Sequence, residues 1–262
     1  MQQRSCGKLR YTSVSICELY RGWFLLRSNF RRFQVYGQRC SGTNALIKLL
    51  ERNLDRLCFT EDFGFKHWLV PDDVEIPADV FVIVIARDAD QWLRSLHARP
   101  WHAVPELKRL DFSDFIRAEW RTRWDEDFWG VDADDPRFGK PIEHELCPRT
   151  GSPFANPIAM RTAKLSNWIS VASRAEGHLF VSHADLVSRP DAIVEQVADA
   201  SRTRAKTPFR PVASYKGQNG RVFQPSRYRE LEQADAEHVK RYLDPEIENL
   251  FRATATGQDT LA

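Results

Sequence analysis

The chain has 262 residues, of which 42% are hydrophobic and 28% charged, a composition typical of a soluble globular protein with one α/β domain. Its 38 basic and 36 acidic residues leave a net charge of +2, so no global field favours nucleic acid or a membrane surface as the partner. The longest apolar run, Val80 to Ala86, is too short for an integral membrane segment, and no signal peptide is recognisable. The five cysteines form no close pair. We therefore expect a cytoplasmic protein.

Strand and helix patterns alternate along most of the chain after residues 1–32, an N-terminal extension without a clear period. In chain order we expect strands at 33–36, 57–60, 79–86 and 178–182, and helices at 45–51, 88–97, 111–125, 157–172, 190–200, 234–243 and 245–253. The run at 79–86 is apolar on both faces, which suits the middle of a parallel sheet. The alternation predicts an α/β fold, a three-layer sandwich with a central parallel sheet, in one domain over 33–253 with a tail at 254–262. The stretch 130–155 is predicted to be a long loop of the kind that forms lids or binding elements.

The most informative stretch, Gly37 to Asn44, stands between the first predicted strand and its helix. A glycine-bounded turn at a helix N-terminus presents backbone N–H groups to an anion, so the stretch predicts a phosphate cradle. Its two glycines have the spacing of a P-loop, but Thr43 stands where a P-loop has lysine, which leaves the positive charge to Arg39. Cys40 is interpreted as a small loop-filling residue. The alternative is a tight turn that binds nothing.

Arg87 ends the strongest predicted strand, and Ser95 follows eight positions later, about two helical turns on. In an open α/β sheet the ligand lies beyond the carboxyl ends of the strands, so these two side chains are placed to bind a second phosphate together. The alternative is that Arg87 pairs with Asp88 or Asp90 while Ser95 is solvated.

Two further segments carry candidate chemistry. His67 follows the second predicted strand beside Lys66, and a histidine with a neighbouring cation suits a general base, although a histidine among aromatic residues is often structural. Later in the chain, Lys216 and Gly217 belong to a glycine-containing stretch that would let the backbone approach a phosphate closely, or that forms an exposed turn.

Taken in order, these segments resemble the sulfotransferases that use 3′-phosphoadenosine 5′-phosphosulfate (PAPS). That family binds the 5′-phosphosulfate with a P-loop variant, Lys-Ser-Gly-Thr-Thr, to which Cys40 to Asn44 correspond, and a bacterial subgroup with a Gly-x-Arg-x-Ser-Gly-Thr-Asn loop is more similar still. The catalytic Lys-Thr-His-Leu-Pro segment of the family is similar to Lys66 to Pro71. Its Arg and Ser at the 3′-phosphate match Arg87 and Ser95, and its late Arg-Lys-Gly-x-x-Gly loop is similar to Tyr215 to Gly220. The resemblance spans residues 33 to about 252.

The resemblance implies a P-loop NTPase-like sulfotransferase fold and transfer of a sulfuryl group from PAPS to a hydroxyl or amine of a small molecule or glycan, without a metal. It implies that His67 is the base and that Arg39, together with Lys66, balances the charge on the leaving oxygen. The residues implied to hold PAPS are Gly37, Arg39, Cys40, Ser41, Gly42, Thr43, Asn44, Arg87, Ser95, Lys216 and Gly217.

The chain also departs from the family pattern. Tyr215 replaces the first arginine of the late loop, and Ala45 replaces the tryptophan that stacks on adenine. Ala89 stands in place of a proline, and lysine directly precedes His67 rather than lying two places ahead of it. Two alternatives therefore stay open: a P-loop kinase of a small molecule or nucleotide, which would need an acidic Mg²⁺ ligand such as Asp88, and a catalytically inactive nucleotide-binding relative.

Overall fold

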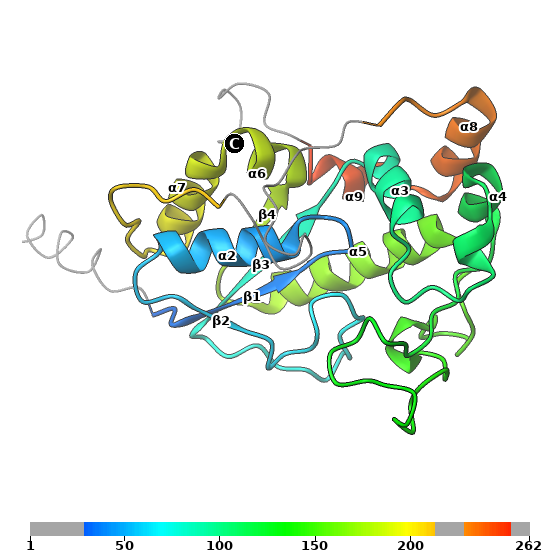
Figure 1. Ribbon diagram of the computed structural model, residues 1–262. Coiled ribbons are helices and arrows are strands. Elements are labelled where there is room, and N and C mark those ends of the chain that lie inside the picture. The colour runs from blue at the N-terminus through cyan, green and yellow to red at the C-terminus, as the bar shows by residue number, and fades with distance from the viewer. Residues whose placement is uncertain (1–28, 213–227, 253–262) are drawn as a thin grey trace, which may run out of the picture.

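A four-stranded parallel sheet forms the centre of the computed structural model, which describes residues 29–212 and 228–252 (Figure 1). The strands, in the order β2-β1-β3-β4, are β1 Arg32–Tyr36, β2 Cys58–Thr60, β3 Val80–Ala86 and β4 His178–Ser182. β3 is fully buried and lies between β1 and β4, so the prediction that this run occupies the middle of a parallel sheet is confirmed.

Helices follow the strands and cover the sheet. They are α2 Thr43–Asn53, α3 Ala89–Ala98, α4 Phe112–Arg117, α5 Pro157–Arg174, α6 His183–Ser188, α7 Pro190–Ala200, α8 Gln233–Tyr242 and α9 Pro245–Asn249, with 3₁₀ turns η1 Leu107–Arg109 and η2 Glu143–Glu145. Most expected elements are present within a few residues of their predicted bounds, and those at 178–182 and 190–200 have the predicted bounds.

Helices pack on both faces of the sheet because successive strand residues point to opposite sides. On one face, side chains such as Phe33 and Ile83 join a buried cluster with residues of α2 and α7. On the other face, Val82 and Val84 pack with residues of α5, among them Trp168. Figure 1 shows α2 and α7 on one side of the strands and α5 on the other. The result is an α/β fold with a parallel sheet flanked by helices, an arrangement compatible with the expected three layers.

A third buried cluster lies beside the sheet and joins α3, α4 and α8 to the start of α5. Trp92 of α3 and Trp120 are its largest fully buried side chains. Each large aromatic side chain of this kind contributes about 1.5–3 kcal/mol through burial of apolar surface. This cluster fixes α3, and therefore Ser95, relative to the end of β3.

The expected helix over 111–125 is wrong beyond residue 117. α4 is capped by the Asp111 carboxylate, which accepts from the Asp114 amide, and it stops at Arg117. The following residues are extended, because the Trp120 amide donates to the Phe154 carbonyl oxygen at 2.8 Å and Arg123 forms an antiparallel bridge with Pro141. Pairing with a distant segment overrides the local helical spacing of the aromatic residues.

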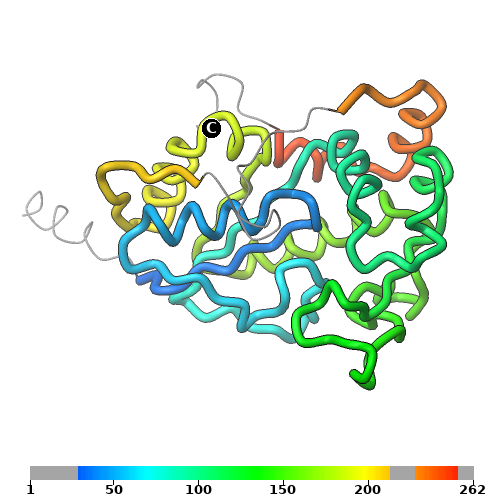
Figure 2. Tube along the Cα trace, viewed as in Figure 1, coloured from blue at the N-terminus to red at the C-terminus, as the bar shows by residue number. Residues whose placement is uncertain are grey.

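Residues 124–140 leave this paired region and return to it, and Figure 2 shows them as the green excursion at the lower right. The stretch 130–155 is irregular apart from η2, as expected for a long loop. α9 ends at Asn249, before the predicted end of the last helix. Most of the predicted N-terminal extension, the late loop with Lys216 and Gly217, and the C-terminal tail lie outside the described residues. Among the described helices, none has both the length and the apolar character needed to cross a membrane.

Candidate functional site

The loop from Gly37 to Gly42 joins the carboxyl end of β1 to α2 and needs both of its glycines. A Cβ at Gly37 would lie 2.6 Å from the carbonyl oxygen of Ile85 in the neighbouring strand. Gly42 has a φ of +86°, in the left-handed region, and a Cβ there would lie 2.9 Å from Cδ2 of His183. The glycine spacing recognised in the sequence therefore reflects a close approach at one end of the loop and a left-handed turn at the other.

Backbone donors of this loop remain available. Within the described part of the chain, the N–H groups of Arg39, Cys40, Gly42, Thr43 and Asn44 donate to no protein acceptor. Gly42 provides no side-chain cap for α2, so the first turn of this 11-residue helix keeps its unsatisfied N–H groups and the positive end of its dipole. Ser41 is fully buried, and its hydroxyl oxygen also has no hydrogen-bond partner within the described residues. The loop has the donor pattern of an anion-binding site.

Arg39 points from this loop into a buried group of charges. Its guanidinium is 6% exposed and forms an ion pair with the fully buried Glu145 carboxylate of η2. Glu145 also accepts from the Lys164 ammonium of α5 at 2.8 Å. The Arg39 carbonyl accepts from the indole N–H of Trp92 at 2.9 Å, which holds the backbone in place. Among the described residues, the second terminal nitrogen of Arg39, Nη2, has no partner.

Burial and the neighbouring charges shift the pKa values of Lys164 and Glu145. Burial lowers the pKa of Lys164 to about 8, because it disfavours the ammonium more than the attraction of Glu145 favours it. Burial would raise the pKa of Glu145, but the charges of Arg39 and Lys164 overcome that effect and lower it, so the carboxylate stays ionised. Glu145 is the shared partner of both cations, so its removal would leave two buried positive charges without a carboxylate.

His67 lies directly beside the loop. Its Nδ1 is 2.6 Å from the carbonyl oxygen of Gly37, and because a carbonyl only accepts, Nδ1 carries the proton of the neutral ring. Nε2 is then the unprotonated nitrogen, and it has no hydrogen-bond partner among the described residues. Burial, and then the positive charges of Arg39 and Lys66, lower the His67 pKa well below its ordinary value, so the ring is a neutral acceptor at physiological pH.

The backbone around His67 is attached to α5 by three side chains on one face of that helix. The Lys164 ammonium donates to the His67 carbonyl oxygen at 2.7 Å, and the Trp168 indole donates to that of Trp68 at 2.8 Å. Asn167 binds both the amide and the carbonyl of Val70. Positions three and four apart on a helix lie on one face, so α5 holds the whole segment in register.

Lys66, by contrast, is not directed to the loop. Its ammonium donates to the Glu61 carboxylate at 2.8 Å and lies 4.4 Å from the centre of the Phe65 ring. The loop cation in this structure is therefore Arg39.

Arg87 and Ser95, the pair predicted to bind a second phosphate, both lie near Cys40 of the loop. The Cys40 thiol donates to the carbonyl oxygen of Arg99 at 3.8 Å. Ser95 and Arg87 both lie close enough to this thiol to influence its pKa. Burial raises the pKa of Cys40, while Ser95 and the positive charge of Arg87 partly offset that rise. Arg87 also lies over the ring of Tyr228, at 5.6 Å from its centre. Asp88 caps α3 by accepting from the Gln91 amide, so its carboxylate belongs to the helix end.

Sequence reasoning missed His183. This residue begins α6 immediately after β4, and the pairing of Ala86 with Ser182 places it beside Arg87 at the edge of the sheet. Its ring lies against Gly42, and burial together with the charge of Arg87 lowers its pKa to about 4. Its position just past a predicted strand was the available signal, because ligands of parallel sheets bind at that edge.

Glu145 and Lys164 were missed as well. Lys164 is 1% exposed and lies in the predicted helix 157–172 next to apolar residues such as Leu165 and Trp168, so a lysine among these positions was a usable signal. Glu145 lies in a long irregular stretch, and no local pattern marks it as buried.

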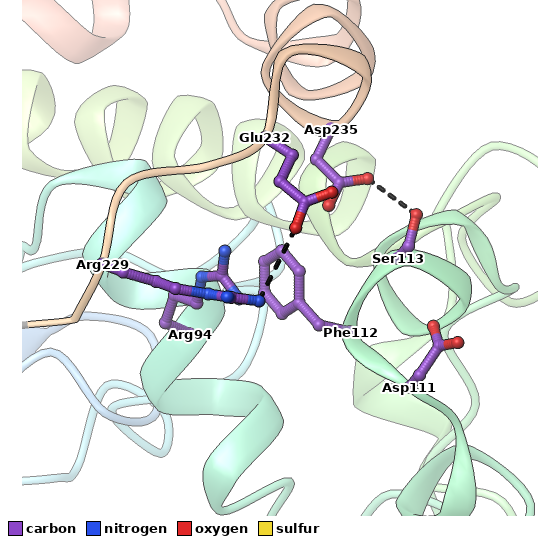
Figure 3. Close-up of a pocket in the computed structure, with 7 residues that line it drawn as sticks. All are labelled: Arg94, Asp111, Phe112, Ser113, Arg229, Glu232 and Asp235. Atoms are coloured by element: carbon purple, nitrogen blue, oxygen red, sulfur yellow. Dashed lines mark hydrogen bonds and ion pairs between the residues drawn. The ribbon is translucent and has the colours of Figure 1, made fainter.

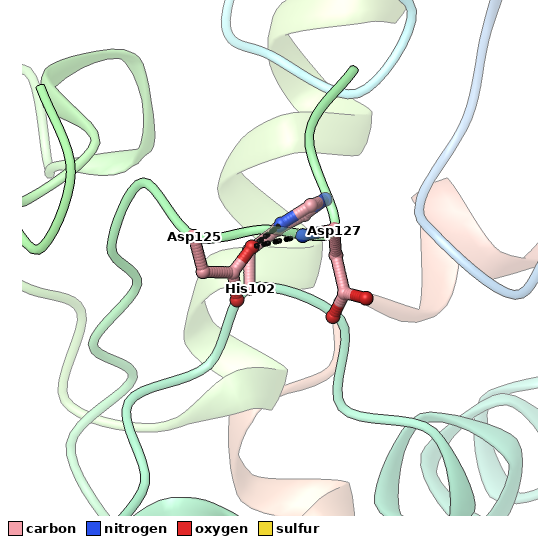
Figure 4. Close-up of side chains that lie close together, drawn as sticks. All are labelled: His102, Asp125 and Asp127. Atoms are coloured by element: carbon pink, nitrogen blue, oxygen red, sulfur yellow. Dashed lines mark hydrogen bonds and ion pairs between the residues drawn. The ribbon is translucent and has the colours of Figure 1, made fainter. Parts of the chain in front are cut away.

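Two other groups lie outside this site. His102, Asp125 and Asp127 place donor atoms within 4.8 Å of one another (Figure 4). His102 Nδ1 is already bonded to the Asp125 carboxylate at 2.6 Å, and the Lys108 ammonium lies 3.6 Å from the other Asp125 oxygen. The Lys108 ammonium balances the charge of Asp125, and burial lowers the pKa of His102 to about 4, so its ring is neutral; the group is assigned a structural role.

A small pocket lies between α3, α4 and the segment that leads into α8 (Figure 3). The Arg94 guanidinium lies 3.9 Å from the centre of the Phe112 ring, and Asp235 accepts from the Ser113 hydroxyl at 2.7 Å. Arg229 pairs with Glu232 at 3.7 Å. Most of the charged groups lining this pocket therefore already have a partner, which for Asp235 is Arg117 outside the pocket.

Comparison of the chain with protein-family models, with curated proteins and with solved structures finds no match in any of the three. The assignment of function therefore depends on the chemistry of the site itself.

Proposed function

We propose that the chain is a sulfotransferase that moves the sulfuryl group of PAPS to a hydroxyl or amine of a small molecule or glycan. The observation that carries this proposal is that the N–H donors of Arg39, Cys40, Gly42, Thr43 and Asn44, in the loop and the first turn of α2, have no acceptor among the described residues. Arg39 supplies the positive charge that a lysine provides in an ordinary P-loop. Arg87 and Ser95 at the same edge of the sheet add a second set of phosphate ligands.

The donor would bind with its 5′-phosphate on the loop amides and on the Thr43 and Asn44 side chains. Arg39, whose Nη2 has no partner among the described residues, would balance the charge that grows on the bridging oxygen. Positioned cations and amides of this kind supply the largest part of the rate of such transfers. Arg87 and Ser95, together with Lys216 and Gly217 outside the described residues, would recognise the 3′-phosphate that distinguishes PAPS from ATP.

Transfer forms one bond and breaks another at sulfur. The acceptor oxygen or nitrogen forms a bond to sulfur, the bond from sulfur to the bridging phosphate oxygen breaks, and that oxygen keeps the electron pair. His67 Nε2 would take the proton of the acceptor, which suits a neutral ring whose Nδ1 already donates to Gly37. The products are the sulfated acceptor and 3′-phosphoadenosine 5′-phosphate (PAP), and no metal takes part in this scheme.

The kinase alternative is less well supported. A P-loop kinase needs a lysine after Gly42 and an acidic Mg²⁺ ligand at a strand end. Thr43 stands in the first position, and the Asp88 carboxylate accepts from the Gln91 amide at 3.1 Å. An inactive nucleotide-binding relative would share the loop and is distinguished by turnover alone.

Thermal unfolding with PAP, ADP and ATP tests the assignment. A ligand that binds only the folded chain raises its unfolding temperature, so PAP should raise it more than ADP or ATP at equal concentrations. A larger shift with ADP or ATP, or no shift with any of the three, would contradict the proposal. Release of PAP from PAPS, measured with a panel of phenols, alcohols and amines, then separates an enzyme from an inactive relative.

A further inference from the structure

A buried charge group connects the two halves of the proposed reaction centre. Glu145 pairs with Arg39 of the phosphate loop, and Lys164 joins Glu145 to the carbonyl oxygen of His67. All three charged side chains are at least nine-tenths buried, at 6% exposure for Arg39 and at most 1% for Glu145 and Lys164. Such a group costs desolvation energy that apolar residues would avoid, so a stabilising role alone explains it poorly.

The two terminal nitrogens of the Arg39 guanidinium have different environments. Glu145 accepts from Nη1 of Arg39, whereas Nη2 has no partner among the described residues. A guanidinium is a rigid planar fork, so a carboxylate that binds one nitrogen also fixes the direction of the other. Lys164 in turn fixes the backbone that carries His67, while Nδ1 of that ring is fixed by Gly37.

We propose that Glu145 and Lys164 are positioning residues for sulfuryl transfer, which orient the Arg39 guanidinium and the His67 ring toward the same reacting group. This role depends on the proposed sulfotransferase function. Neither residue needs to touch PAPS. Glu145 belongs to the irregular stretch 130–155, so a segment remote from the loop in sequence would set the geometry of the loop cation.

The substitution Glu145→Gln separates positioning from stability. It keeps the size of the side chain but removes a negative charge beside the anion site, so PAP should bind as tightly as to the wild type or several-fold more tightly. Because Arg39 loses its fixed direction, release of PAP from PAPS should slow at least tenfold. Glu145→Asp, which keeps the charge, should recover part of that rate.

Asp235→Asn is the matched control. Asp235 is also a buried carboxylate in an ion pair, with Arg117 at 2.7 Å, but it joins α4 to α8 away from the loop. The substitution Asp235→Asn should lower the unfolding temperature without changing the rate of PAP release. If Glu145→Gln does not fold, Lys164→Met and Lys164→Arg serve in its place, with a slower rate in the first and partial recovery in the second.

Calorimetric titration with PAP and the PAP-release assay are carried out on all variants. For Glu145→Gln, retained or tighter affinity with a rate at least tenfold lower supports the positioning role. For Lys164→Met, which also removes a positive charge near the loop, a fall in rate at least tenfold larger than its fall in affinity supports it. A Glu145→Gln rate within twofold of wild type, or an affinity that falls in parallel with the unfolding temperature as in an ordinary destabilised variant, would overturn it. A wild-type chain that binds no PAP would refute the sulfotransferase function itself, and with it this role.

Discussion

Nδ1 of His67 donates to the carbonyl oxygen of Gly37 at 2.6 Å, which ties the proposed base to the first residue of the phosphate loop. The bond fixes the tautomer, so that the unprotonated Nε2 is the nitrogen available to an acceptor. It also means that loss of the ring disturbs the loop as well as the proton transfer.

His67→Asn is the substitution that separates these two effects. The asparagine amide can replace Nδ1 as the donor to Gly37 but offers no base, so PAP affinity should stay within a few-fold of wild type while PAP release slows by about 10²–10⁴-fold. Calorimetry and the release assay measure the two quantities. An unchanged rate would show that His67 has only a structural role.

Arg87 is predicted to determine selectivity for the 3′-phosphate. Arg87→Met should reduce the preference for PAP over adenosine 5′-phosphate by about 10–100-fold, because a charge-assisted contact to a phosphate contributes about 1.5–3 kcal/mol. The control Arg109→Met removes an exposed cation that pairs with Glu106. Equal losses of affinity for both nucleotides would place Arg87 outside the 3′-phosphate site.

Alanine should be tolerated less well at Gly37 of the loop than at Gly130, which lies outside it, because different physical effects oppose the two substitutions. In Gly37→Ala the new Cβ meets the Ile85 carbonyl oxygen, and we expect the free energy of unfolding to fall by about 1–3 kcal/mol or more. Gly130 has a φ of +74° and open space around it, so Gly130→Ala should cost about 1 kcal/mol from backbone strain alone. Urea denaturation compares them, and equal costs would contradict the close approach at Gly37.

Stability should fall in mild acid because three buried histidines resist protonation. Burial is the main cause in each case, lowering the pKa of His102 and His183 to about 4 and that of His67 well below its ordinary value. Between pH 6.5 and 4 the unfolded chain binds protons that the folded chain does not, so the free energy of unfolding decreases as pH falls, by up to about 1.4 kcal/mol per pH unit for each group.

Urea denaturation between pH 7.5 and 4.5 measures this slope. Besides burial, Arg39 opposes the protonation of His67 and His102, and Arg87 opposes that of His183. Asp125 partly offsets these effects at His102. In the variant His183→Asn, the free energy of unfolding should depend less steeply on pH, because the contribution of one histidine is absent. A slope that this variant leaves unchanged would mean that His183 titrates normally in the folded chain.

Nucleotide affinity should weaken above pH 8 because Lys164 then loses its charge. The pKa of Lys164 is lowered to about 8, mainly by burial and partly offset by Glu145. Below that pH the ammonium adds positive charge near the loop, and above it the charge is absent, so PAP affinity decreases as pH rises through 8. Calorimetry from pH 7 to 9 should show this decrease in the wild type and not in Lys164→Arg, and equal pH dependence in both would refute it.

Much of the sheet could be predicted from the sequence, because its signals are local. The uniformly apolar run of β3 and the glycines of the loop each report a backbone environment at their own position. The helix expected through Trp120 failed because its alternative, pairing with Phe154, depends on residues more than thirty positions away.

Part of the candidate site could likewise be predicted from the sequence, and part could not. Arg87, Ser95 and the loop meet because parallel strands end at one edge of the sheet, a rule that applies before any coordinates are known. The charge group of Arg39, Glu145 and Lys164 follows no such rule, since it depends on how a long irregular stretch folds back against α5. Lys66 shows the converse case: it is next to His67 in the sequence, but its ammonium pairs with Glu61 rather than with the site.

Three side chains of α5, Lys164, Asn167 and Trp168, hydrogen bond to the backbone of residues 67–70, and they lie within about one helical turn. One residue inserted ahead of Lys164 would rotate these three side chains by about 100° and separate them from the segment together. Insertions in the excursion at 124–140 would leave the same side chains in place. The length of the chain is therefore constrained inside α5 and free to vary in the excursion. Homologues should differ in length at 124–140 before they differ in length within α5.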